Sequence, residues 1–242
     1  MGTDEQHSVA RSVTLHLLPG ILITVFYALI TPVVRSLGFP SLMAIFLSIL
    51  IMLVPFELGY LLYRSRLMNG DFSLRNMVLN RDLTPSIQLV ALVIPLFIWS
   101  GIFAVLLYPP LDAFFIGNFF SWLPDWFFFA EDFSQYSSGA LLVTWVLGLI
   151  LNAFVGPVTE ELYFRGYLLP RISRFGALAP VINVVLFSLY HFFTPWQNVG
   201  RILGLLPMVY AVWWKRDIRI GIAVHVLGNL FSMLALLPVL FA

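Results

Sequence analysis

Long apolar runs separated by short polar segments are the main pattern along the chain. An α-helix needs ~20 mostly apolar residues to cross the hydrocarbon core of a bilayer, and about seven of these runs approach that length. The expected spans are residues 13–34, 42–63, 87–107, 140–169, 178–193, 202–214 and 218–241. We therefore predict an all-α, polytopic transmembrane helical bundle of about seven spans, without internal repeats.

The composition agrees with a membrane protein. Hydrophobic residues make up 60% of the 242 residues and charged residues 10%, whereas a typical soluble domain has about 25% charged residues. The chain has no cysteine, which excludes disulfides, thiolate chemistry and cysteine-based metal sites. Residues 1–12 lack the basic region and the small-residue cleavage site of a removable signal peptide. No basic patch indicates a nucleic-acid partner.

Basic residues are concentrated in alternate connections between the expected spans. Cytoplasmic loops of membrane proteins carry an excess of Lys and Arg. The connections that share one side contain Arg11, Arg64, Arg66, Arg75, Arg81, Arg165, Arg171, Arg174, Lys215, Arg216 and Arg219, and the other side receives Arg35 and Arg201. We therefore predict an integral protein of the cell membrane with a cytoplasmic N-terminus and an external C-terminus.

Two of the connections are long enough to have a structure of their own. Residues 67–84 carry mixed charges and are expected to form either an interfacial helix on the cytoplasmic face or a plain linker. Residues 108–139 lack Lys and Arg and are crowded with Phe and Trp. Because aromatic residues collect at bilayer interfaces, we interpret this segment as an outer interfacial loop, with a lid or substrate-docking role as the alternative.

Two adjacent carboxylates, Glu160 and Glu161, lie inside the fourth span together with Arg165. Ionisable groups at membrane depth are costly unless they are paired or reach water, so they indicate a functional site. Helical spacing allows Glu161 to pair with Arg165 as a structural support, while Glu160 points about 100° away and is available for chemistry. The span is expected to tilt or to break at Gly156-Pro157. Small or polar residues that suit close helix packing are Gly148, Asn152, Gly156, Gly221 and Gly228.

Three further polar side chains occur in later spans. His191 lies near the end of the fifth span, and His225 and Asn229 are four residues apart in the last span, so they share one helical face. At 1.5 Å per residue, their depths overlap with that of Glu160 in the cytoplasmic half of the bilayer or near its midplane. We therefore expect these four side chains to meet in one cavity.

The remaining polar residues of the spans receive structural interpretations. Glu57 is expected near the cytoplasmic end of the second span, where it snorkels to the interface or pairs with a nearby arginine, and a role in substrate access is secondary. His16 is expected at the bilayer interface. Asn152, Asn183 and Arg201 are interpreted as packing or interface residues.

A carboxylate, two imidazoles and an amide form a set that suits the activation of water. Glu160 can take a proton from water, and His191 can hold that water or donate to the leaving group. His225 and Asn229 can stabilise the oxyanion that forms when water adds to an amide carbonyl. The other chemical interpretation is a zinc site with Glu160, His191 and His225 as ligands. The His-Glu-x-x-His motif is absent, so the spacing gives no positive support for a metal.

Three separated motifs connect these residues to a known family. They are Glu160-Glu161-Leu-Tyr-Phe-Arg165, Phe187-Ser-Leu-Tyr-His191 and His225-Val-Leu-Gly-Asn229. In type and order they resemble the Glu-Glu-x-x-x-Arg, Phe-x-x-x-His and His-x-x-x-Asn motifs of the CPBP family of intramembrane proteases. That family includes type II CAAX prenyl endopeptidases and bacteriocin-processing or immunity-associated (Abi-like) proteins. The likeness covers about residues 154–231.

The resemblance implies an intramembrane endopeptidase that hydrolyses a peptide bond in a membrane-associated or lipid-modified protein or peptide. Its catalytic core would be residues 140–242, from spans four to seven, joined with the helices, linker and outer loop of residues 1–139 in one membrane domain. By that likeness Glu160 activates water with help from His191, and His225 and Asn229 stabilise the oxyanion. Family members have been described both as metalloproteases and as metal-independent glutamate proteases, and we predict the latter, without a cofactor.

Two other classes of function are compatible with the sequence. A non-catalytic membrane immunity or scaffold protein of the same fold would use the polar cluster to hold helices together or to bind a peptide. A proton- or ion-coupled transporter would use buried Glu and His as a relay, although the absence of repeated halves counts against it. The expected partners are a peptide or protein substrate and the lipid bilayer, and no nucleic acid.

Overall fold

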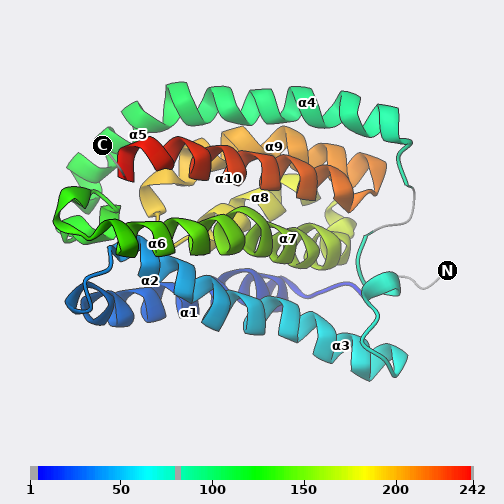
Figure 1. The fold of residues 1–242 in the computed structure, drawn as a ribbon. Coiled ribbons are helices and arrows are strands. Elements are labelled where there is room, and N and C mark those ends of the chain that lie inside the picture. The colour runs from blue at the N-terminus through cyan, green and yellow to red at the C-terminus, as the bar shows by residue number, and fades with distance from the viewer. Residues whose placement is uncertain (1–4, 80–82, 241–242) are drawn as a thin grey trace.

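The computed structural model describes residues 5–79 and 83–240, and the regular structure in these residues is helical, without a β-strand (Figure 1). The prediction of an all-α fold is therefore confirmed. Two residues used in the sequence predictions, Arg81 and Phe241, lie outside the described part of the chain.

The first half of the chain folds into three long helical rods. Helix α1 (Val9–Ser36) is the first, and α2 (Ser41–Ser48), a π-helix (Ile49–Gly59) and α3 (Tyr60–Asn69) run on as the second. After a 3-10 turn (Leu74–Asn76), the third rod consists of α4 (Ser86–Ile102), a π-helix (Phe103–Leu107), α5 (Tyr108–Phe115) and a π-helix (Ile116–Phe120). Short 3-10 turns (Asp125–Phe128 and Phe133–Gln135) lead to the second half.

The second half begins with the rod that carries the two adjacent carboxylates. It consists of α6 (Ser138–Ile150), a π-helix (Leu151–Val155), α7 (Gly156–Glu160), a π-helix (Glu161–Leu168) and a 3-10 helix (Leu169–Leu178). The remaining elements are α8 (Ala179–Tyr190), a 3-10 turn (Pro195–Gln197), α9 (Asn198–Lys215) and α10 (Ile218–Leu240). The rod does not break at Pro157, because proline occupies the first turn of α7, where its missing N–H is tolerated. The chain reverses instead at Gly176, whose φ is 55°, a value that favours glycine.

Five helical stretches of the described chain are long and apolar enough to cross a membrane, which makes this a multi-pass membrane protein. They are Val9–Ser36, Ser41–Asn69, Ser86–Phe120, Ser138–Tyr190 and Ile218–Leu240. The prediction of about seven spans is thus confirmed only in part. The fourth and fifth predicted spans belong to one helical stretch. The sixth, α9, is not among the five, because Arg201 and Lys215 dilute its apolar character.

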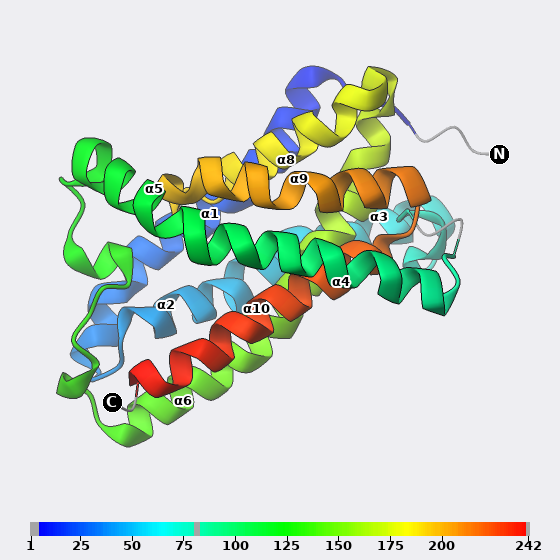
Figure 2. The same cartoon turned by 90° about the horizontal axis from the view of Figure 1, so that it is seen from above.

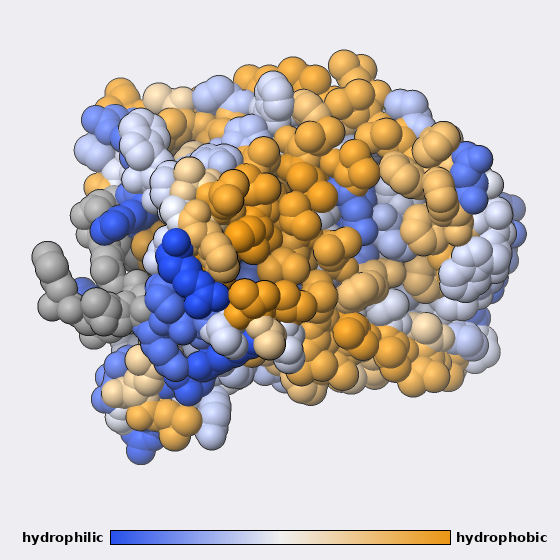
Figure 3. All heavy atoms as spheres, turned by 180° about the vertical axis from the view of Figure 1, so that it is seen from behind, coloured by the Kyte–Doolittle hydropathy of each residue, from blue (hydrophilic) through white to orange (hydrophobic). Residues whose placement is uncertain are grey.

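The helices run between two ends of an elongated bundle, with the two termini at opposite ends (Figures 1 and 2). The α3–α4 and α9–α10 connections and the 3-10 segment before α8 lie at the end that carries the N-terminus. The basic connections therefore share that end. Hydrophilic residues gather there, and apolar side chains cover the middle of the face shown in Figure 3. A cytoplasmic N-terminus and an external C-terminus remain a prediction.

The helices pack through a core shared by both halves of the chain. Tyr27 of α1 and Phe46 of α2 belong to the same buried cluster as Phe187 and Tyr190 of α8. Close helix packing at Gly148 is confirmed, because a Cβ there would collide with the side chains of Phe46 and Met233. The same expectation is wrong for Gly228, which has nothing within 4 Å of an added Cβ.

The aromatic segment differs from a simple outer loop. Helical structure continues to Phe120, because the Pro109-Pro110 pair lies in the first turn of α5, where proline does not interrupt a helix. Phe127 is buried, and the rings of Phe120, Phe127 and Phe128 contact Trp196. Phe114, Phe119 and Trp122 are exposed, as an interfacial interpretation expects. The segment is therefore in part a packed cap, and the alternative role as a lid is untested.

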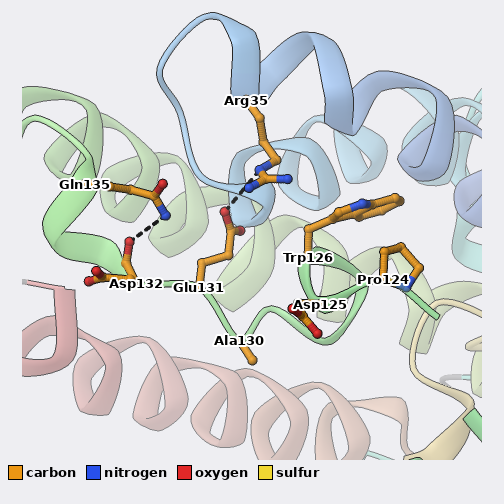
Figure 4. Close-up of a pocket in the computed structure, with 8 residues that line it drawn as sticks. All are labelled: Arg35, Pro124, Asp125, Trp126, Ala130, Glu131, Asp132 and Gln135. Atoms are coloured by element: carbon orange, nitrogen blue, oxygen red, sulfur yellow. Dashed lines mark hydrogen bonds and ion pairs between the residues drawn. The ribbon is translucent and has the colours of Figure 1, made fainter. Parts of the chain in front are cut away.

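A surface pocket lies beside this cap, between the end of α1 and the connection that leads to α6 (Figure 4). In it the Glu131 carboxylate pairs with Arg35 at 3.5 Å and accepts a hydrogen bond from the Ser41 backbone N–H at 2.7 Å. These contacts tie the connection to the first two rods. The residues that line the pocket are Arg35, Pro124, Asp125, Trp126, Ala130, Glu131, Asp132 and Gln135. The pocket therefore contains none of the predicted catalytic residues.

The connection between α3 and α4 is a docked linker and not an interfacial helix. Its described residues contain only a single short 3-10 turn. Met77 and Leu79 are buried, and the Leu79 backbone N–H donates to the carbonyl of Gly166 at 2.8 Å. This contact attaches the linker to the rod that carries Glu160 and Glu161.

Candidate functional site

Glu161 and Arg165 form the buried ion pair that helical spacing predicts. Both side chains have no exposed surface, and Glu161 Oε1 lies 3.2 Å from Arg165 Nη1. The Arg165 guanidinium stacks over the ring of Phe187 on α8, 3.8 Å from its centroid. An aromatic face attracts a cation most strongly when both are desolvated, so Phe187 adds a second attraction that holds Arg165 in place.

Glu161 has another partner that the sequence did not reveal. Its Oε1 also lies 3.0 Å from Nδ1 of His225 on α10. Helix α10 comes this close because Gly221 faces the Glu161 carboxylate, where a Cβ would collide with Oε2. The spacing of residues along one helix cannot show this contact, because 64 residues separate the two partners.

Glu160 faces both candidate histidines. Its Oε1 lies 3.9 Å from His191 Nε2 and its Oε2 lies 3.7 Å from His225 Nε2. The side chain is 7% exposed, so it is turned toward protein and not toward lipid. Both separations are longer than a direct hydrogen bond, and they suit a water molecule or a substrate atom between carboxylate and imidazole. The α7, α8 and α10 regions thus bring three of the four predicted site residues together.

His191 directly follows the last residue of α8, and its surroundings fix its orientation. Its Nδ1 lies 2.9 Å from the carbonyl of Phe187. A carbonyl accepts only, so Nδ1 carries the proton and Nε2 of the neutral ring has a lone pair directed at Glu160. Arg201 holds the loop that follows, donating to Thr194 Oγ1 at 2.8 Å and to Gln197 Oε1 at 3.1 Å. This agrees with the interpretation of Arg201 as a packing residue.

Asn229 lies one turn beyond His225 on α10. Its Nδ2 donates to the backbone carbonyl of Asn152 at 2.9 Å and so joins α10 to the π-helical turn before α7. An amide nitrogen has two N–H donors, so this contact uses one of them. Asn229 therefore links helices, as its structural interpretation expects, and the second donor is the one available for an oxyanion.

Two sequence predictions about polar residues are wrong. Glu57 does not snorkel, because its side chain is fully buried, and among the described residues it pairs with no arginine but accepts a hydrogen bond from the Tyr190 hydroxyl at 2.7 Å. His16 is not interfacial, because it too is fully buried. Its Nε2 lies 3.2 Å from Nδ2 of Asn183. Asn183 is a packing residue, as predicted.

Asp217 fixes the start of α10 and thereby the position of His225. It accepts hydrogen bonds from the backbone N–H groups of Thr84 and Arg219, at 2.8 and 3.0 Å, and pairs with the Arg219 guanidinium at 2.7 Å. Burial opposes ionisation of Asp217, but the hydrogen bonds from Arg219 and Thr84 outweigh it and lower its pKa to about 2. A carboxylate at a helix N-terminus also interacts favourably with the helix dipole.

The zinc alternative stays an open prediction. Among residues 5–79 and 83–240, no group of three or more His, Cys, Asp or Glu side chains has the geometry of a metal site. The Nδ1 atom of His225 is engaged by Glu161, a contact found both in histidines that act in a reaction and in histidines that bind a metal. A metal-independent mechanism remains a prediction.

Comparison with known families identifies the segment that contains these residues. Residues 142–231, which run from within α6 to within α10, match the family model described as type II CAAX prenyl endopeptidase Rce1-like. No curated protein and no solved structure gives a significant match. The matched segment contains all four predicted catalytic residues, and the resemblance drawn from their motifs is confirmed. Residues 142–231 are therefore an Rce1-like domain of the CPBP type, from a family of proteases.

Proposed function

We propose that this protein is an intramembrane endopeptidase that hydrolyses a peptide bond in a membrane-associated or lipid-modified protein or peptide. The observation that carries the proposal is the position of the Glu160 carboxylate, 3.9 Å from His191 Nε2 and 3.7 Å from His225 Nε2 inside an apolar bundle. A base and two imidazoles at this spacing can hold one water molecule and one substrate carbonyl. The family match supports the same reaction class.

In the proposed reaction Glu160 is the general base. It takes a proton from a water molecule that also donates to the Nε2 lone pair of His191, and the resulting hydroxide attacks the carbonyl carbon of the scissile bond. A C–O bond forms and the carbonyl oxygen becomes an oxyanion. When the C–N bond breaks, the protonated Glu160 returns its proton to the leaving nitrogen. No serine, cysteine or threonine nucleophile takes part.

His225 and Asn229 are the proposed oxyanion donors. Because the Glu161 carboxylate accepts from Nδ1, Nε2 of His225 can donate to the oxyanion when the ring is protonated. Its ring lies between two carboxylates, with Nε2 3.7 Å from Glu160 Oε2 and Nδ1 3.0 Å from Glu161 Oε1. Glu161 thus acts as a positioning residue for His225 as well as a partner of Arg165.

The test is cleavage by the purified protein in liposomes. The probes are two fluorogenic peptides with the same cysteine-containing sequence, one prenylated on that cysteine and one unmodified, and mass spectrometry locates the cut. We expect Glu160→Gln to lower kcat by about 10³-fold, within the range for loss of a general base. The matched control is Glu131→Gln, because the Glu131 side chain is 3% exposed and pairs with Arg35 outside the site.

Each outcome decides between the candidate functions. Cleavage at the wild-type rate by a folded Glu160→Gln variant would refute the assignment of the base. Failure of the wild-type protein to cut either peptide would favour the non-catalytic immunity or scaffold protein. Cleavage that survives exhaustive chelation supports the metal-independent reaction, and loss that zinc restores contradicts it. The ratio of the two cleavage rates measures whether a lipid group on the substrate is recognised.

A further inference from the structure

Glu57 is a fully buried carboxyl group that the proposed reaction does not use. It lies on the π-helix Ile49–Gly59, which packs against α7, and its Oε2 has no hydrogen-bond partner among the described residues. A buried carboxyl with so few partners destabilises a protein relative to an apolar side chain of similar size. Its presence at this position is therefore not explained by packing.

The Glu57 hydrogen bond leads directly to the candidate site. Its Oε1 accepts from the hydroxyl of Tyr190 at 2.7 Å, and Tyr190 directly precedes His191, whose Nε2 lies 3.9 Å from Glu160 Oε1. Tyr190 thus connects a carboxyl group of the second rod to the histidine that faces the proposed base on α7.

Tyr190 is also the immediate neighbour of His191. Its ring meets the His191 ring edge-on, with centroids 4.9 Å apart, and meets the Phe164 ring at the same distance. Helix α1 closes the other side, because Gly20 lies so near Tyr190 that an added Cβ would collide with its backbone. The Tyr190 ring is therefore confined on several sides, and the bond to Glu57 fixes the remaining direction, that of its hydroxyl group.

We propose that Glu57 and Tyr190 are positioning residues of the endopeptidase: Glu57 anchors the Tyr190 hydroxyl, and Tyr190 sets the position of His191 relative to Glu160. This inference rests on the proposed function. It gives the second rod, which lies outside the matched segment 142–231, a part in the reaction. Glu57 acts only through Tyr190, so its carboxyl group serves as a hydrogen-bond acceptor that an amide can replace.

The test combines kinetics with a spectroscopic measurement. In the liposome assay, Tyr190→Phe and Glu57→Leu are each expected to lower kcat by about 10- to 100-fold, as for loss of a hydrogen bond to a charged group, with KM within about twofold. Glu57→Gln retains an acceptor and should stay within about threefold of wild type. The double variant Tyr190→Phe with Glu57→Leu should be no slower than Tyr190→Phe alone.

The matched control is Tyr27→Phe, which removes another tyrosine hydroxyl whose hydrogen bond, to the Trp126 carbonyl, lies outside the site. In ¹⁵N-histidine spectra, the His191 resonance should move in Tyr190→Phe and Glu57→Leu and stay in place in Glu57→Gln and Tyr27→Phe. This signature does not need cleavage, so it decides the proposal even if the wild-type protein cuts neither peptide, which would refute only the protease.

Three results would overturn the proposal. The first is a Tyr190→Phe variant with wild-type kcat and an unmoved His191 resonance, while Glu160→Gln is inactive. The second is a Glu57→Leu effect of the same size in the Tyr190→Phe background, because the carboxyl group would then act independently. The third is a Glu57→Gln variant as impaired as Tyr190→Phe. If Glu57→Leu does not fold, Glu57→Gln and Tyr190→Phe still decide between support and refutation.

Discussion

Buried polar groups are arranged differently in the matched segment 142–231 and in the helices that precede it. In the matched segment they form a cluster of opposite charges, in which Glu161 lies between Arg165 and His225. In the earlier helices, the buried titratable side chains of His16 and Glu57 have partners far away in the chain, Asn183 and Tyr190. The earlier helices therefore hold residues of the matched segment in place, and the matched segment contains the charged cluster.

The largest expected effect is on the charged cluster. Replacing Arg165 with Met leaves the fully buried Glu161 without its permanent cation, and breaking a buried pair in this way costs about 3–5 kcal/mol. The control is Arg35→Met, because Arg35 is 41% exposed at the side chain and its pair with Glu131 is 3.5 Å long. Glu131 is buried but keeps its hydrogen bonds from the Ser41 backbone N–H and the Tyr136 hydroxyl. Loss of Arg35 should therefore cost less than loss of Arg165.

Thermal unfolding in detergent micelles measures both changes. If Arg165→Met is no less stable than Arg35→Met, then the contact with His225 is enough to keep Glu161 buried. The charged cluster would then not distinguish the matched segment from the earlier helices. If both variants lose several kcal/mol, the outer pair contributes far more than its exposure indicates.

The comparison also explains which parts of the site could be predicted from the sequence. The pair of Glu161 and Arg165 was predictable because four residues make one helical turn, and this spacing is visible in the sequence. The meeting of Glu160 with the two histidines required only an estimate of depth in three spans. The contact of Glu161 with His225 was not predictable, because it depends on how closely Gly221 lets α10 approach.

Glu57 and His16 show the limit of this reasoning most clearly. Membrane-depth arguments place a lone polar residue at an interface unless a partner is known. The partner of Glu57 is 133 residues away and that of His16 is 167 residues away, and neither pairing leaves a periodic trace in the sequence. In the fold, the helical character was predictable from the apolar runs. The continuation of the third rod to Phe120 was not, because Pro109-Pro110 is compatible with either a helix end or a first turn.

A smaller effect is expected for His16. Its Nδ1 lies 2.7 Å from the carbonyl of Ser12, so the proton on Nδ1 is used there and Nε2 accepts from Asn183. His16→Leu removes that acceptor and should destabilise the protein by about 1–3 kcal/mol, because a buried amide donor loses a partner. Asn183 retains its bond to the Phe164 carbonyl at 3.0 Å, which limits the loss.

The control for His16→Leu is Thr24→Val, because the Thr24 hydroxyl donates within its own helix, to the Gly20 carbonyl. Thermal unfolding midpoints in the same detergent measure the loss of stability in both variants. Equal stability of the two variants would show that the hydrogen bond between His16 and Asn183 adds nothing beyond helix packing. Glu57 would then be the remaining example of an earlier helix that stabilises the matched segment through a polar contact.

The smallest and most local effect concerns His7, just before α1. Its ring is fully buried against Tyr167, and its backbone N–H donates to the Arg171 carbonyl at 2.9 Å. Burial, followed by the nearby charges of Arg11 and Arg171, lowers the pKa of His7 from 6.5 to about 4. Between pH 6.5 and about pH 4, His7 is protonated when the N-terminal segment is released and neutral when the segment is docked. Docking of the N-terminal segment should therefore weaken as pH falls from 6.5 toward 4.

The hydrogen-exchange protection factor of the His7 amide, measured as a function of pH, reports this release directly. The variant His7→Phe keeps an apolar ring in the same place and should remove the pH dependence above about pH 4.5. Glu5 does not interfere there: its hydrogen bond with Arg11 lowers its pKa below 4.5, so its contribution is lost only in more acidic solution. Equal pH dependence in His7→Phe would assign the effect to another group. A flat profile in both proteins would show that the docked segment accommodates the imidazolium, and that this contact between the two regions is less apolar than its burial indicates.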